Sequence, residues 1–227
     1  MTIDERGEGR GEEGRERASP ARQPAINAPW PVTALCALFL GLYFLQTLAP
    51  SPDAVLARFG FAPADLAAGR WGGLVSALFI HGNWAHVLLN TLGALAFGAP
   101  VSRLFGTRAV GAATFFAFFL VCGVFSSLAY ALLHWGAPYL LVGASGGVSG
   151  FMGAASRMLE RRGGGLAPFA SRTVVGMAFA WVLVNVIIGF VGLGVTGGAP
   201  IAWEAHLAGY FAGLLLIGPA ARLFTKL

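Results

Sequence analysis

The chain has 227 residues, of which 56% are hydrophobic and only 11% are charged. Soluble domains carry about 25% charged residues, so a chain this apolar would expose too much apolar surface in water. The formal net charge is +5, but the arginines form short clusters between apolar runs and no basic face, which argues against a nucleic-acid partner. The composition instead predicts a membrane protein in contact with lipid.

The first 28 residues form a polar leader that is rich in Gly, Glu and Arg. Such a composition cannot bury a core and predicts disorder. The many acidic residues and the absence of a clear cleavage site argue against a secretory signal. We therefore expect a cytoplasmic leader over residues 1–28, without a catalytic role, and a membrane domain over residues 29–227.

Six continuous apolar runs follow the leader, at about 30–49, 84–104, 109–133, 143–158, 173–195 and 203–224. All but the fourth are long enough to cross a hydrocarbon core of about 30 Å as helices, and their continuity excludes β-barrel spans. We predict an all-α, polytopic six-transmembrane-helix bundle with a short, central fourth helix. Cys36 and Cys122 fall inside apolar runs, so we expect packing roles for them and no disulfide.

The basic residues are distributed unevenly between the two sides of this predicted bundle. Only Arg58 and Arg70 fall on the side opposite the leader, and all other Arg and Lys residues fall on the leader's side. The positive-inside rule then places both termini in the cytoplasm. A single Lys beside many Arg residues is typical of a GC-rich bacterial genome, so we expect a bacterial plasma (inner) membrane.

A long loop over residues 50–83 separates the first two runs and is only partly polar. Long loops without regular structure are uncommon unless they have a function. The apolar content favours a position in the membrane interface. A small extracytoplasmic cap is the alternative.

Ser145 opens the short fourth run, directly after Gly143 and Ala144. The run ends near Arg157, so at about 1.5 Å per residue Ser145 lies roughly 18 Å from that end. This depth is inside a hydrocarbon core of about 30 Å, where non-helical backbone is tolerated only around a wet, protein-lined cavity. We therefore expect an aqueous pocket with Ser145 at its floor.

His206 begins the sixth run from the same outer side as Ser145. A serine hydroxyl is a weak nucleophile until a base activates it, and an imidazole can serve as that base. Gly209 and Gly213 follow on the face of the histidine, and Gly143 and Gly146 flank the serine. Small residues let membrane helices pack closely, as a short Ser–His hydrogen bond requires.

His86 and Asn90 are four residues apart and share one face of the second run. Acyl transfer needs hydrogen-bond donors directed at a developing oxyanion. An imidazole, a side-chain amide and the backbone N–H of Ser145 can supply them. The alternative is that His86 and Asn90 only hold the first loop in place by hydrogen bonds.

The other polar residues in or near the runs are expected to be structural. We assign His81 and His134 to the surface or to loops, and Ser149 and Asn185 to hydrogen bonds between helices. Glu204 points roughly 200° away from the histidine two residues later, which favours a solvated interface charge. We find no recognised spacing of metal ligands and expect neither a metal nor a cofactor.

Three segments resemble the signature motifs of the rhomboid family of intramembrane serine proteases. They are HGNWAHVLLN at 81–90, GASGG at 143–147 and AHLAGYFAG at 205–213. The resemblance extends over nearly all of residues 30–225, with six spans in the family's order. One motif alone would be weak evidence, but three motifs on the second, fourth and sixth spans are strong together.

The resemblance implies a Ser–His dyad without an acidic third member. It implies that Ser145 is the nucleophile, His206 the base, and His86 and Asn90 the groups that stabilise the oxyanion. The implied substrates are proteins with single transmembrane helices that contain helix-weakening residues near the cut. The alternative is a non-catalytic rhomboid-like chaperone or sorting factor that binds membrane helices, but such a protein is expected to lose the serine or the histidine. A small transporter or channel would need intramembrane charges along a path, or broken repeats, and neither is clear here.

Two positions depart from the family pattern. Gly72 follows Trp71 in the first loop, where the family often has Trp-Arg. Ser149 stands four residues after the serine, where many members have an aromatic residue that packs on the histidine. Phe151 and Tyr210 are the nearby aromatic residues that could replace it.

Overall fold

The computed structural model describes residues 28–159, 165–191 and 201–224. Within these residues all regular structure is helical, apart from an isolated antiparallel bridge between Phe61 and Leu141. The predicted all-α class is therefore confirmed. The predicted leader lies almost entirely outside the described residues.

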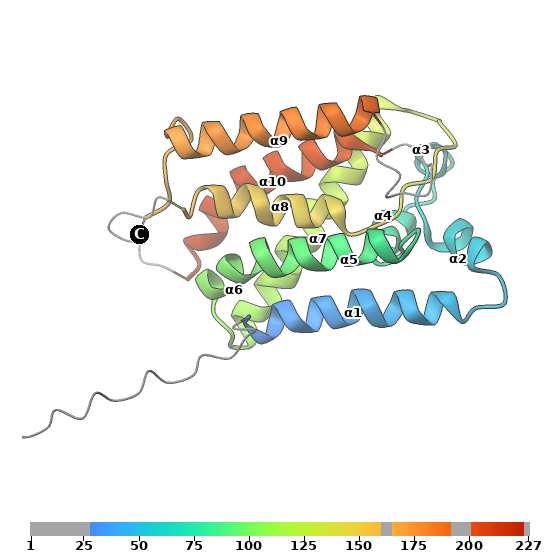
Figure 1. Cartoon of the computed structure of the whole chain (residues 1–227), viewed down its shortest axis with the longest axis horizontal. Helices are drawn as coiled ribbons and strands as arrows, with labels where there is room; N and C mark the ends of the chain where they lie inside the picture. Colours follow the sequence, from blue (N-terminus) through green and yellow to red (C-terminus); the bar gives the residue numbers. More distant parts are fainter. Residues whose placement is uncertain (1–27, 160–164, 192–200, 225–227) are drawn as a thin grey trace, which may run out of the picture.

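The long helices run side by side along the bundle (Figure 1). They are α1 (Trp30–Thr47), the continuous stretch that begins with α5 (Trp84–Gly93), α7 (Ala109–Leu133), α9 (Arg172–Val191) and α10 (Trp203–Ala221). The 12-residue α8 (Ser145–Ser156) lies among them. A π-helical turn η2 (Ala94–Gly98) and α6 (Ala99–Phe105) continue α5 without a break. These bounds lie close to the predicted apolar runs, and residues 192–195 of the predicted fifth run lie outside the described residues.

Four helical stretches among the described residues are long and apolar enough to cross a membrane. They are Trp30–Thr47, Trp84–Phe105, Ala109–Leu133 and Arg172–Gly189. The protein is thus an integral membrane protein. The count of six spans stays a prediction, because α8 has only 12 residues and α10 has 19 but is not among the four.

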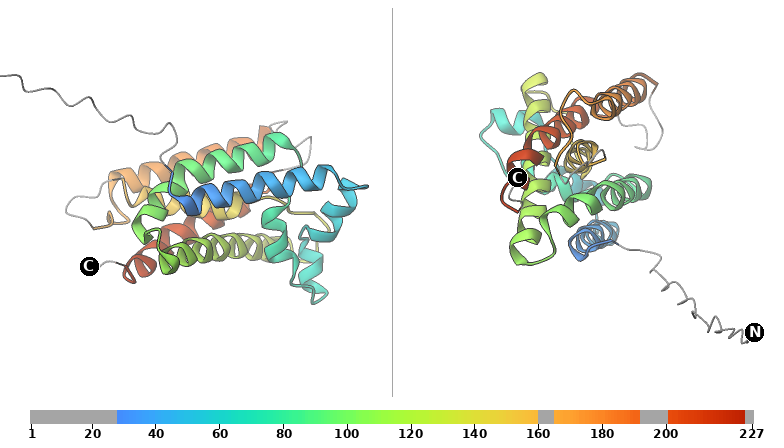
Figure 2. Two further views of the ribbon diagram at one scale, coloured as in Figure 1. Left: turned by 90° about the horizontal axis from the view of Figure 1, so that it is seen from below. Right: turned by 90° about the vertical axis from the view of Figure 1, so that its left-hand side faces the viewer.

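Helix α8 lies inside the bundle, where it contacts α5, α7, α9 and α10. The end-on view in Figure 2 shows the same arrangement. At about 1.5 Å per residue, α8 is roughly 18 Å long, shorter than a membrane core of about 30 Å. The first residue of α8 therefore lies below the end of the bundle, as the sequence predicts.

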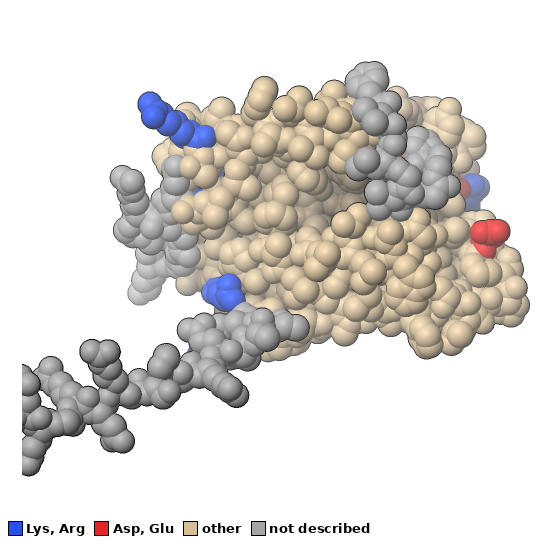
Figure 3. Space-filling view, viewed as in Figure 1, with Lys and Arg blue, Asp and Glu red and all other residues tan. Residues whose placement is uncertain are grey.

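The sides of the bundle are apolar and its charges lie at the two ends. Of the four stretches that are long enough to cross a membrane, Arg172–Gly189 of α9 is the least covered, since only 11% of it is buried. Figure 3 shows a wide band without charged residues on one face. Basic residues mark the helix ends at one end of the bundle, namely Arg103, Arg108, Arg157, Arg172 and Arg222, while Arg58 and Arg70 belong to the loop at the other end.

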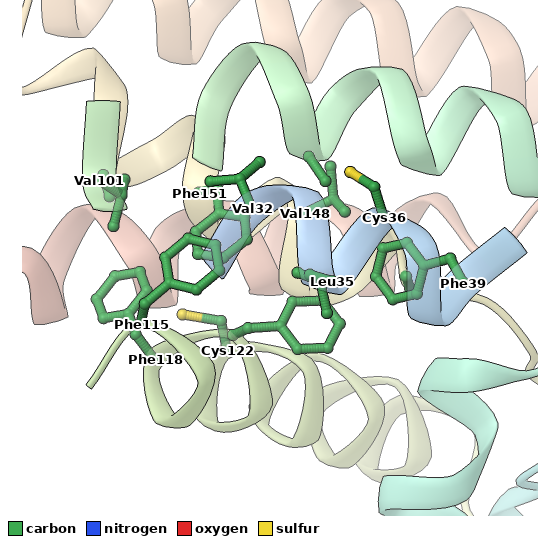
Figure 4. Packing of buried hydrophobic residues seen from close by; sticks show 14 of the residues in the cluster. Val32, Leu35, Cys36, Phe39, Val101, Phe115, Phe118, Cys122, Val148 and Phe151 are labelled. Atoms are coloured by element: carbon green, nitrogen blue, oxygen red, sulfur yellow. The ribbon is translucent and has the colours of Figure 1, made fainter. Parts of the chain in front are cut away.

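Aromatic rings pack α8 against α7 in the core (Figure 4). The rings of Phe115 and Phe151 are stacked with their centroids 4.7 Å apart, and the ring of Phe118 is also stacked with that of Phe151, at 6.3 Å. Offset stacking adds to the stabilisation from packing. Cys36 and Cys122 are both free and buried in this core, in agreement with their expected packing role.

The first loop folds into short helices that pack against α1 and α7. They are α2 (Pro52–Phe59), α3 (Pro63–Ala67), α4 (Gly73–Ser76) and the 3-10 turn η1 (Ala77–Phe79). The end of this loop is held by Gln46 of α1, whose Nε2 donates to the carbonyl of His81 at 2.8 Å and whose Oε1 accepts from the His81 N–H at 3.3 Å. We expected His81 at the surface or in a loop. It does lie in a loop, but its side chain is fully buried.

Candidate active site

Ser145 stands at the first position of α8, where two contacts with the first loop fix the incoming chain. Phe61 and Leu141 exchange backbone hydrogen bonds of 3.0 and 2.6 Å, and the Gly143 N–H donates to the carbonyl of Ala77 at 2.8 Å. Gly143 has a φ of 112°, which glycine adopts without steric cost. The loop over residues 50–83 therefore holds the segment that leads down to Ser145.

His206 lies in the first turn of α10, and its Nε2 is 2.8 Å from the Oγ of Ser145. This distance is that of a good hydrogen bond. Both residues are partly exposed. The expected wet pocket stays a prediction, because residues 192–200, which lead towards α10, lie outside the described residues.

Glycines bring the backbones of α8 and α10 into contact below this pair. A Cβ added to Gly209 would overlap the carbonyl of Gly146, and one added to Gly213 would overlap the carbonyl of Gly150. Gly143 differs from its expected role in helix packing. It precedes α8, and an added Cβ there would lie 2.5 Å from His86 Nε2, so this glycine makes room for the imidazole and not for α10.

His86 and Asn90 on α5 both reach the backbone just before Ser145. Asn83 caps α5 by accepting a hydrogen bond from the backbone N–H of His86 at 2.8 Å. A Cβ added at Gly143 would lie 3.4 Å from Asn90 Nδ2. The side chain of Asn90 is 5% exposed, and its Nδ2 has no hydrogen-bond partner among the described residues. A buried donor without a partner is costly, so this amide is available for a group that is bound here.

Asn185 of α9 completes the surroundings of His206. Its Oδ1 is 2.9 Å from His206 Nδ1, and its Nδ2 donates to the carbonyl of Trp181 at 2.9 Å. We expected Asn185 to form an interhelical hydrogen bond, but the sequence did not identify its partner. The four-residue spacing of Trp181 and Asn185 places them on one helix face, which is the only sequence signal for their shared contact.

Trp181 provides the aromatic neighbour of His206 that the sequence left unassigned. The two rings lie 6.4 Å apart at 36°, and Trp181 stacks on Tyr210 at 6.4 Å. Phe151 instead packs in the core against α7. The aromatic neighbour of the histidine thus comes from α9. Ser149, at the α8 position where many rhomboid-family members have an aromatic residue, is a buried polar side chain.

Glu204 lies near His206 in sequence but pairs with another histidine. Its Oε1 is 3.2 Å from Nε2 of His134, which follows the end of α7. This pair ties α7 to the start of α10. Glu204, which we expected to be a solvated interface charge, is partly exposed and also pairs with a histidine. The acid does not form a third member with Ser145. Among the described residues no group of three His, Cys, Asp or Glu side chains could hold a metal ion.

A family model and two known proteins that resemble this chain all carry the rhomboid name. The model of the Rhomboid domain family matches residues 68–222. Rhomboid protease GluP of Bacillus subtilis (strain 168) is 28% identical over 173 residues, which cover 75% of this chain and 31% of that protein. RHOMBOID-like protein 5 of Arabidopsis thaliana is 26% identical over 148 residues, or 65% of this chain and 43% of that protein. The matched part of the chain therefore spans less than half the length of either relative.

Proposed function

The chain belongs to the rhomboid family, and on that premise we propose that it is an intramembrane serine endopeptidase that cleaves transmembrane helices of other proteins. The observation that carries the proposal is the 2.8 Å contact between Ser145 Oγ and His206 Nε2. The contact lies at the start of a helix that is too short to cross the membrane. A hydroxyl beside an imidazole base is the arrangement of an activated nucleophile.

In this proposal Ser145 and His206 act in two successive half-reactions. The Oγ of Ser145 attacks the scissile carbonyl carbon while His206 Nε2 accepts the hydroxyl proton. The imidazolium then gives this proton to the leaving amine as the C–N bond breaks, which leaves an ester on Ser145. A water molecule, deprotonated by His206, hydrolyses the ester and restores the free hydroxyl.

In this proposal three groups stabilise the oxyanion of the tetrahedral intermediate: the first N–H groups of α8 and the side chains of His86 and Asn90. The first N–H groups of a helix have no intrahelical acceptor, and the N-terminus of α8 favours negative charge. The side chains of His86 and Asn90 border the backbone two residues before Ser145. Donors that are already fixed in place stabilise a developing charge strongly, and Asn90 is buried beside this backbone, which supports their assignment to this role.

We expect Asn90→Ala to lower kcat by about 10²-fold with little change in KM, because an oxyanion donor acts mainly in the transition state. Cleavage of a reporter substrate in proteoliposomes measures both constants. Thermal unfolding in detergent separates this role from the structural alternative. If Asn90 only pins the first loop, the variant should lose stability, while kcat per folded molecule should stay unchanged.

The charge distribution supports an orientation and a location. Five described arginines mark one end of the bundle, and Arg58 and Arg70 lie in the loop at the other end. The positive-inside rule then favours cytoplasmic termini, with Ser145 nearer the outer side. A bacterial inner membrane fits the Arg-rich composition. Protease accessibility of tagged termini in inverted vesicles tests this orientation.

A fluorophosphonate probe tests the proposed chemistry directly, because it reacts only with an activated serine. We expect purified wild-type protein to be labelled at Ser145, as mapped by mass spectrometry. The matched control is Ser149→Ala, which alters a buried serine on the same helix and should retain labelling. Absence of the label from well-folded protein would contradict the proposal and favour a non-catalytic rhomboid-like protein that binds membrane helices.

A further inference from the structure

Asn185 is buried on α9, and both ends of its side-chain amide are engaged. The residue is 1% exposed. The carbonyl of Trp181 can only accept a hydrogen bond, so the NH₂ group of the amide must face it, at 2.9 Å. The other end of the amide, Oδ1, therefore faces Nδ1 of His206, at 2.9 Å. The Trp181 carbonyl thus fixes which way the amide of Asn185 points.

This orientation determines the tautomer of His206. Because Oδ1 is only an acceptor, Nδ1 of the imidazole must carry the hydrogen. In a neutral imidazole the lone pair is then on Nε2, and Nε2 is the atom 2.8 Å from Ser145 Oγ. The opposite tautomer would place a hydrogen on Nε2 and could not accept the proton of the serine.

We propose that Asn185 is a positioning residue that holds His206 in the Nδ1–H tautomer and in the ring orientation that lets Nε2 act as base. The inference rests on the proposed function and deepens it: the pair of Ser145 and His206 is supported by a neutral third residue from α9. Trp181, one helical turn before Asn185, borders the same ring at 6.4 Å and limits its rotation.

A neutral amide suits this position in the bundle. An ionised carboxylate among apolar helices carries a large desolvation cost, whereas an amide can satisfy Nδ1–H without a net charge. When His206 accepts the proton from Ser145, the Nδ1–H bond to Oδ1 persists, and the hydrogen bond becomes charge-assisted and stronger. The amide therefore stabilises the protonated imidazole of His206, which exists only transiently during the reaction.

Two variants of similar size test the proposal through kinetics. Asn185→Leu removes the acceptor, and we expect kcat to fall about 10²-fold with KM little changed, because the base then samples the wrong tautomer. Asn185→Asp keeps an acceptor at the same place, because burial favours the neutral carboxyl, whose O–H can replace the amide donor to the Trp181 carbonyl. This variant should recover most of kcat. The matched control is Val184→Leu at the neighbouring, 44% exposed position, which should cleave like the wild type.

A spectroscopic readout separates this proposal from the proposed function. Nitrogen-15 NMR of histidine-labelled protein distinguishes the two tautomers, and a His206→Gln sample assigns the signal. In the non-cleaving Ser145→Ala background we expect the Nδ1–H tautomer with Asn185 present and a mixed or Nε2–H population with Asn185→Leu. Unchanged kcat in Asn185→Leu, or an unchanged tautomer, would overturn the proposal. If Asn185→Leu does not fold, failure of the folded Asn185→Asp protein to retain the Nδ1–H tautomer would overturn it.

Discussion

Replacing Ser145 with alanine should reduce cleavage of a reporter transmembrane substrate by at least about 10³-fold, since the proposed mechanism forms the acyl-enzyme on the Ser145 hydroxyl. The change removes one oxygen atom at a partly exposed position and leaves the glycine contacts of α8 untouched, so the fold and membrane insertion should persist. The measurement compares initial cleavage rates of purified proteins in proteoliposomes, with thermal unfolding as the test of folding.

Combining this change with His206→Ala gives a sharper test of the same prediction. Residues that act as a unit are strongly non-additive, so the two single variants and the double variant should lose activity to a similar extent. If the losses of the single variants multiply in the double variant, the two residues act independently. Undiminished cleavage by purified Ser145→Ala would reject Ser145 as nucleophile altogether.

The positions of the long helices could be predicted because each apolar run is continuous and has glycine, proline or charged residues close to its ends. The predicted run at 109–133 coincides with α7, Ala109–Leu133. The position of Ser145 below the end of the bundle could be predicted for a similar reason, since helix length converts directly into distance along the helix axis. Both inferences need only the order of the residues along the chain and the length of each helix.

The neighbours of His206 could not be predicted, because they depend on which helices pack together and at what rotation. The spacing of Trp181 and Asn185 identifies a shared face of α9, but nothing in the spacing directs that face towards α10. Gly143 shows the same limit. Its place in the sequence, close to Gly146, suggests that it packs between α8 and α10. Its φ of 112° and its position beside His86 depend instead on the contacts with the first loop.

Gly209→Ala should inactivate the protein by separating the two helices that carry Ser145 and His206. The added Cβ would overlap the carbonyl of Gly146, which is backbone and cannot rotate away, so α10 must move. A displacement of about 1 Å at a catalytic pair costs about 10²-fold in rate, and overpacking should destabilise the fold by about 1–3 kcal/mol. Cleavage rates and thermal unfolding in detergent measure the two effects.

The matched control is Gly176→Ala on α9, where an added Cβ meets no atom within 4 Å. Alanine is favoured over glycine in helices by about 1 kcal/mol, so this variant should be as stable as the wild type or more so, and fully active. The same substitution is thus expected to change stability in opposite directions. Steric overlap should make Gly209→Ala less stable, whereas helix propensity should make Gly176→Ala as stable as the wild type or more so. If Gly209→Ala kept full activity and stability, the close approach of α8 and α10 would not be what brings His206 to Ser145.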